Sequence, residues 1–295
     1  MDSTISEWLI NYLGGFTRRG LTGQLFIILS NFFELKLRLI IFYFQCVIYF
    51  IFLVLIYNYF KNLPKFYIFY LSFFCPLFIT YHVAELEILA RKEILVFINF
   101  LIFLLISENI KLKKFINIYL ILTLPLKILI WEPIIFFLPF YILLLIKIKN
   151  YGNFLILVTD LLKIFTLSII TIFILIFNNF SFENEKLMCE TMKIIYGEHC
   201  YMSLGYLDTS IIQNFESLFR DIKVEYIFRY LMIYFIGFFP IFYLLFHLEK
   251  KFFFEIKILN KIKVYYLFIL VSLPILILFM MGLDWGRWMN IYYFF

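Results

Sequence analysis

Charged residues are scarce in this chain of 295 residues, at 16%, whereas soluble domains carry about 25%. Histidine occurs only three times. The opening MDSTISEW has neither a basic start nor an apolar centre, so we expect no secretory signal peptide there. Hydrophobic residues make up 64% of the chain. This composition excludes a soluble globular domain and predicts a polytopic α-helical membrane protein.

Apolar runs of a length suited to crossing a bilayer recur along the chain and predict an all-α transmembrane bundle of about eight spans. They cover residues 37–60, 65–83, 94–107, 115–131, 133–147, 154–178, 226–247 and 264–282. The third and fifth runs are short, so a re-entrant segment is an alternative for each.

The expected organisation is a single transmembrane domain over residues 1–295. It includes an amphipathic segment at 1–36 and one polar loop at 179–225. A fragment of a longer protein is an open alternative, because another apolar run begins at Phe294-Phe295.

The net charge of +6 comes largely from lysines in alternate short loops. Positively charged short loops stay in the cytoplasm. The segments between these loops, including 1–36 and 179–225, are therefore expected on the opposite, outer face of the membrane. Topology accounts for the basic balance, and no nucleic-acid partner is expected. The lysines are Lys61, Lys65, Lys111, Lys113, Lys114, Lys147, Lys149, Lys250, Lys251, Lys257, Lys261 and Lys263.

Four cysteines fall into two groups. Cys46 and Cys75 lie within apolar runs and are expected to be inert. Cys189 and Cys200 share the polar loop, where an oxidising compartment would allow a disulfide, which we predict. The cysteine and histidine spacings indicate no metal site.

Arginine is absent from the lysine-rich loops, although the chain has seven arginines. A guanidinium binds phosphate or carboxylate through two parallel hydrogen bonds, which an ammonium cannot do. Arg18 and Arg19 follow a glycine-rich turn and precede an expected helix, an arrangement that favours anions. Together with Arg91 and Arg287, which lie near the ends of other apolar runs, they are the candidate phosphate ligands.

Acidic residues accompany these arginines. Glu85 and Glu87 precede Arg91, and Asp284 lies three residues before Arg287. If residues 82–93 are helical, Glu87 and Arg91 lie about one turn apart and form a structural ion pair.

Several other charges are interpreted as structural, because oppositely charged residues about one helical turn apart pair with each other. A proton or ion path is the alternative for the pair deep in the sixth apolar run. The expected pairs are Glu34–Arg38, Lys127–Glu132 and Asp160–Lys163.

Three motifs, NYLGGFTRRGLTG at 11–23, ARKEIL at 90–95 and DWGRW at 284–288, cover about a tenth of the chain. Their combination resembles bacterial O-antigen or capsule polymerases and GT-C glycosyltransferases. This resemblance implies a polyprenyl-diphosphate-linked sugar as substrate, with chemistry at the outer face of the cytoplasmic membrane. In such chemistry a carboxylate accepts the proton of the acceptor hydroxyl. The resemblance therefore makes Asp284, Glu87 and Glu85 the candidate catalytic residues. Carboxylates of the GT-C pattern would add a divalent metal. The sugar, the linkage and the oligomeric state are not specified.

Two other classes stay open. A transporter or flippase of a lipid-linked or small substrate would place charges near the bilayer midplane and show related halves. A non-catalytic subunit of a membrane complex is the third class. The enzyme class further predicts that Arg18, Arg19 and Arg287 converge on one anionic site beside Asp284.

Overall fold

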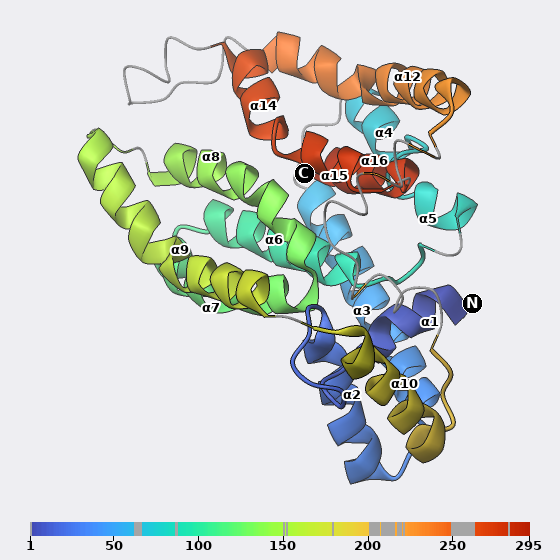
Figure 1. The fold of residues 1–295 in the computed structure, drawn as a ribbon. Helices are drawn as coiled ribbons and strands as arrows, with labels where there is room; N and C mark the ends of the chain where they lie inside the picture. Colours follow the sequence, from blue (N-terminus) through green and yellow to red (C-terminus); the bar gives the residue numbers. More distant parts are fainter. Residues whose placement is uncertain are drawn as a thin grey trace. The chain divides into compact units, whose positions relative to one another are not determined.

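Helices dominate the computed structural model of the chain, and the part described contains no strand (Figure 1). The expected all-α fold class is confirmed. The structure describes residues 2–61, 67–85, 88–149, 151, 153–178, 180–200, 207, 216, 220, 222–248, 263–282 and 284–295.

The described part of the chain folds into α-helices, several of which begin and end close to apolar runs of the sequence. In chain order they are α1 (Asp2–Leu9), α2 (Gly20–Phe33), α3 (Leu37–Phe60), α4 (Tyr67–Phe73), α5 (Tyr81–Ala84), α6 (Glu93–Glu108), α7 (Ile116–Ile130), α8 (Leu138–Lys149), α9 (Phe154–Phe177), α10 (Phe182–Tyr196), α12 (Val224–Leu248), α14 (Val264–Ser272), α15 (Ile275–Met280) and α16 (Trp285–Phe294). Two 3-10 turns, η1 (Lys113–Phe115) and η2 (Glu132–Phe137), precede α7 and α8.

The chain divides into two compact units. The first unit comprises Met1–Asn62, Glu85–Ile134 and Ile164–Thr209. The second comprises Leu63–Ala84, Ile135–Lys163 and Ser210–Phe295.

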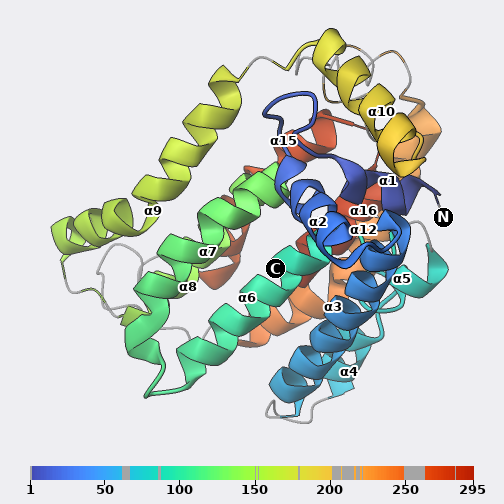
Figure 2. The same cartoon turned by 90° about the horizontal axis from the view of Figure 1, so that it is seen from below.

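The first unit is built around α3, α6 and α7, with α6 packed between the other two (Figure 2). Along α3 the buried residues Ile41, Ile48, Phe52 and Ile56 recur at spacings of four and seven, so they form one face of the helix. The remaining faces of α3 are also apolar, and Phe50 is 68% exposed. A helix that is apolar on all sides suits a membrane environment.

Three helices are long and apolar enough to cross a membrane, each with 24 residues: Leu37–Phe60, Phe154–Phe177 and Val224–His247. At 1.5 Å per residue such a helix is about 36 Å long, which exceeds the roughly 30 Å hydrocarbon core. Other apolar runs form shorter helices, and the eight spans stay a prediction.

Two of the expected spans are broken by proline. In the run at 65–83, α4 ends at Phe73, shortly before Pro76. In the run at 264–282, α14 ends at Ser272 and α15 begins after Pro274. Proline lacks the backbone N–H and disfavours helical geometry in the residue before it, so both runs fold as shorter pieces.

In the second unit, α12 packs against α4, α14 and α16 (Figure 1). The core is aromatic: the ring of Phe238, which is fully buried, lies 4.7 Å from that of Tyr292. Asn290 Nδ2 donates to the carbonyls of Leu77 and Phe78 at 2.8 and 3.1 Å. The short helix α16 is therefore part of the core of this unit.

Candidate functional site

The glycine-rich motif folds as a tight turn between α1 and α2. Gly15 has a φ of 120°, and its N–H donates to the carbonyl of Tyr12 at 3.0 Å. A side chain at Gly14 would place its Cβ 2.0 Å from the carbonyl oxygen of Asn184. The turn ends at Arg19, whose φ of 62° lies in the left-handed region. A non-glycine residue there costs about 1–3 kcal/mol, so its contacts must offset that cost.

Arg19 joins two acidic residues from distant parts of the first unit. Its Nε donates to both carboxylate oxygens of Glu132, at 3.0 and 2.7 Å, and Nη2 donates to Oε1 at 2.8 Å. Its Nη1 lies 3.4 Å from Oε1 of Glu7 in α1. Arg18 lies at the edge of the group, with Nη1 4.0 Å from Glu132. The guanidinium of Arg19 thus lies between two carboxylates.

Lys92 lies next to Arg19 and is fully buried. Its Nζ donates to the backbone carbonyl of Arg19 at 2.6 Å, which helps to hold the left-handed conformation. Burial lowers the pKa of Lys92 to about 7, against the opposing effect of the Glu7 carboxylate. A lysine with this pKa exchanges its proton near neutral pH.

Glu132 keeps its negative charge despite its position. Burial raises its pKa, but the charge and hydrogen bonds of Arg19, together with Arg18, outweigh that effect and lower the pKa. Glu93, next to Lys92, is also buried. Three acidic and three basic residues thus form one group, which we name the charge cluster. Its members are Glu7, Glu93, Glu132, Arg18, Arg19 and Lys92.

Three separate segments are locked together around the charge cluster. The indole N–H of Trp8 in α1 donates to the carbonyl of Ala90 at 3.0 Å, next to the ARKEIL motif. Gly23 in α2 approaches α1 so closely that a Cβ would lie 2.0 Å from the carbonyl oxygen of Ile10. The absence of a side chain at Gly23 lets the two helices meet behind the arginines.

The predicted residues of the ARKEIL region have different surroundings. Arg91 is partly buried, and its backbone N–H donates to the carbonyl of Ile88 at 3.3 Å. Glu85 is exposed. Glu87 lies outside the described residues, so its pairing with Arg91 stays a prediction. The segment contributes Lys92 and Glu93 to the charge cluster.

Asp284 and Arg287 belong to the second unit. Arg287 is buried and donates from Nη1 to Oδ2 of Asp284 at 3.2 Å, and its guanidinium lies 5.3 Å from the ring centroid of Trp288. The side chain of Asp284 is 57% exposed. Arg18 and Arg19 belong to the first unit and Arg287 to the second, so the convergence of the three arginines on one site stays a prediction.

Three residues that were expected to pair with a residue about one helical turn away contact residues more distant in the sequence instead. Glu132 pairs with Arg19 and Arg18 where Lys127 was expected.

The same holds at the two other positions. Arg38 donates from Nε to both oxygens of Glu198, at 2.9 and 2.7 Å. Asp160 is bonded by Lys149, at 2.5 Å, and by the hydroxyl of Tyr151.

Four members of the charge cluster were not among the predicted site residues: Glu7, Lys92, Glu93 and Glu132. Glu7 is 3% exposed and Lys92 is fully buried. The available signal for Glu7 was an acid directly before the apolar sequence Trp8-Leu9-Ile10, in a helix of only eight residues. Charged residues are rarely buried without a partner, so such an acid indicates a paired base.

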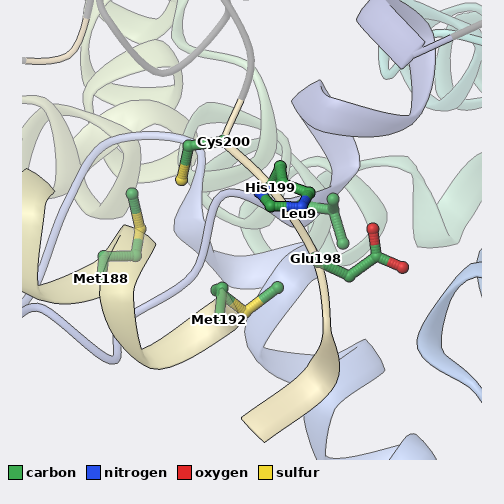
Figure 3. Close-up of a pocket in the computed structure, with 6 residues that line it drawn as sticks. All are labelled: Leu9, Met188, Met192, Glu198, His199 and Cys200. Atoms are coloured by element: carbon green, nitrogen blue, oxygen red, sulfur yellow. The ribbon is translucent and has the colours of Figure 1, made fainter. Parts of the chain in front are cut away.

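Cys189 and Cys200 form a disulfide, which confirms the prediction. Cys200 borders a shallow depression beside α10, with the side chains of α10 on one side and Leu9 on the other (Figure 3). The lining residues are Leu9, Met188, Met192, Glu198, His199 and Cys200.

The divalent metal implied by the GT-C resemblance finds no matching ligand set in the part of the chain that the structure describes. There, no three His, Cys, Asp or Glu side chains gather as metal ligands. Comparison with protein families, curated proteins and solved structures finds no match to this chain.

Proposed function

We propose that this chain is a multi-span protein of the bacterial cytoplasmic membrane that acts on a polyprenyl-diphosphate-linked sugar at the outer face, as a glycosyltransferase or polysaccharide polymerase. The observation that carries the proposal is the charge cluster. It presents paired arginines on a glycine-rich turn, backed by a fully buried lysine, within a unit built around the apolar helices α3, α6 and α7.

The arrangement divides the two arginines by role. Arg19 is held by Glu132 and Glu7 and positions the turn. Arg18 is 28% exposed and has a longer contact to Glu132, 4.0 Å, so its guanidinium is the better placed to meet a ligand. A diphosphate bound there would have the negative charge of its leaving group neutralised as the sugar–phosphate bond breaks.

The substrate chemistry suits such a position. A polyprenyl chain is apolar and stays in the bilayer, while its diphosphate lies at the interface. The acceptor hydroxyl would lose its proton to a carboxylate, for which Asp284, Glu87 and Glu85 remain the candidates. The lysine asymmetry of the loops supports an outer-face location of the N-terminal turn.

A binding experiment tests the proposal. The purified protein in lipid nanodiscs would be titrated with a polyprenyl diphosphate and, separately, with the uncharged polyprenol of equal length. We expect a clear preference for the diphosphate, weakened about tenfold in Arg18→Gln and partly retained in Arg18→Lys. Lys186→Gln, an exposed cation on α10, is the matched control and should bind as wild type. Equal affinity for the two lipids would refute the proposal.

A transporter or flippase is the second candidate, because one charged group lies within a helix long enough to span. Asp160 in α9 is bonded by Lys149 and Tyr151. Ionisable residues inside membrane segments mark ion or substrate paths by default. Loss of lipid translocation in Asp160→Asn liposomes, with sugar transfer unchanged, would favour this class.

A further inference from the structure

The segment 178–200 lies against the N-terminal turn, although the two are more than 150 residues apart. Asn178 Nδ2 donates to the carbonyl of Phe16 at 2.6 Å. The carbonyl of Asn184 occupies the space that a side chain at Gly14 would need. Figure 1 shows α10 beside α1 and α2. Backbone and side chains of this segment therefore support the glycine-rich turn directly.

Apolar packing continues the same contact. A small core joins the end of α1 to α10 and includes both cysteines of the disulfide at its edge. Its buried members are Ile10, Met188 and Leu207, with Phe180, Cys189 and Cys200 packed against them. The disulfide thus lies within the interface between the two segments.

An ion pair fixes the far end of the segment. Glu198, which is 6% exposed, accepts two hydrogen bonds from Arg38 at the start of α3. Glu198 lies two residues before Cys200. The C-terminal part of the segment is consequently tied to α3 by charge and to α10 by the disulfide.

We propose that the Cys189–Cys200 disulfide is a redox-sensitive clasp: its reduction frees the segment 178–200 from the N-terminal turn and loosens Arg18 and Arg19. A disulfide limits the conformations that the loop between its cysteines can adopt, and reduction of the disulfide makes the more open conformations accessible. Because the segment supports Gly14 and Phe16, its release removes contacts from the turn that carries the arginines.

The chemistry is thiol–disulfide exchange with a dithiol reductant. A thiolate of the reductant attacks Sγ of Cys200, which borders the depression in Figure 3, and Cys189 leaves as a thiolate and takes up a proton. The second thiol of the reductant then displaces Cys200. The protein gains two thiols, and the reductant is oxidised to a disulfide.

Hydrogen exchange of the full-length protein in nanodiscs tests the clasp without any substrate. Amide exchange would be followed by mass spectrometry before and after addition of dithiothreitol. We expect exchange in peptides from 9–17 and from 182–200 to become at least roughly tenfold faster, with peptides from 264–295 unchanged. A Cys189→Ser/Cys200→Ser variant should show the fast exchange without reductant.

The controls separate the clasp from general loosening. Cys46→Ser removes an exposed free thiol and should respond to dithiothreitol as the wild type does. If the double serine variant fails to fold, reduction of the folded wild type still provides the test. Faster exchange in 182–200 with no change in 9–17 would overturn the proposal, because the disulfide would then staple only its own loop. The test is independent of the proposed enzymatic activity.

Discussion

Arg19 donates three hydrogen bonds to Glu132, a residue 113 positions further along the chain. The pair is largely buried, with side-chain exposures of 23% and 19%. A buried ion pair is not strong evidence of added stability, yet removing one partner is costly because the other is left as an uncompensated charge. The pair therefore fixes where the end of α7 meets the turn before α2.

Replacing Arg19 should reveal this dependence. Arg19→Ala leaves Glu132 without its main partner, and we expect a loss of about 3–5 kcal/mol in unfolding free energy. Arg19→Lys keeps the charge and loses the paired hydrogen bonds, at a cost of about 1.5–3 kcal/mol. The midpoint of heat denaturation in detergent measures both.

An exposed ion pair provides the matched control for Arg19. Lys186 and Glu190 lie 3.9 Å apart on α10, with side-chain exposures of 65% and 59%. Such pairs contribute about 0.3–0.5 kcal/mol. Lys186→Ala should leave the midpoint nearly unchanged, and an equal loss in Lys186→Ala and Arg19→Ala would show that the buried pair has no special role.

The buried Lys92 predicts a pH dependence of stability. Its pKa is about 7 in the folded protein and near 10.5 when unfolded. Between these values the unfolded state binds the extra proton, so the contribution of Lys92 to stability rises with pH across this window, by about 1.4 kcal/mol per unit. Below about pH 7 both states are protonated, and the contribution is constant.

Comparison with Lys92→Met isolates this contribution from other titrating groups. Denaturation midpoints would be measured from pH 6 to 9.5, a range chosen to cover the window. The variant should lack the rise that the wild type shows above about pH 7. Parallel curves for the two proteins would show that Lys92 titrates at its ordinary pKa.

The helix bounds that were predicted best belong to the longest apolar runs. The run at 37–60 coincides with α3, and the run at 154–178 differs from α9 by one residue. Composition alone defines such helices, because an uninterrupted apolar run has no competing local signal. The runs at 65–83 and 264–282 failed as single helices, since proline interrupts each one.

The charge cluster was only partly predictable, because sequence spacing indicates ion pairs only between residues about one helical turn apart. The glycine-rich turn identified Arg18 and Arg19. Spacing, however, predicted Lys127 as the partner of Glu132. The actual partner comes from a contact between α2 and α7 that no local pattern encodes. The prediction that Arg38 pairs with Glu34 was wrong for the same reason, because its partner Glu198 lies 160 residues away in the sequence.

Two glycines provide a test of close helix approach. Gly23→Ala would place a methyl group 2.0 Å from the carbonyl oxygen of Ile10, so backbone must move, at a cost of about 1–3 kcal/mol. Gly282 has no neighbouring atom within 4 Å of its Cβ position, and Gly282→Ala should change stability by less than about 0.5 kcal/mol. Equal denaturation midpoints for the two variants would contradict the close packing of α1 on α2.

The sidedness of the membrane is the last prediction. Twelve lysines in alternate loops predict that those loops lie in the cytoplasm and that α10 lies on the outer face. Glu183 in α10 and Lys111 before α7 are both exposed, so a cysteine at either position should be reactive. In a Cys46→Ser background, a membrane-impermeant thiol reagent should label Glu183→Cys in intact cells, and Lys111→Cys only after lysis.

Labelling of both variants in detergent provides the control for reactivity, and a non-reducing gel checks that the native disulfide is intact. The disulfide supplies an independent reason for the same orientation, because a bond between Cys189 and Cys200 persists in an oxidising compartment and is reduced in the cytosol. Labelling of Lys111→Cys but not Glu183→Cys in intact cells would therefore reverse the topology. It would also place the charge cluster on the cytoplasmic side, away from any sugar donor at the outer face.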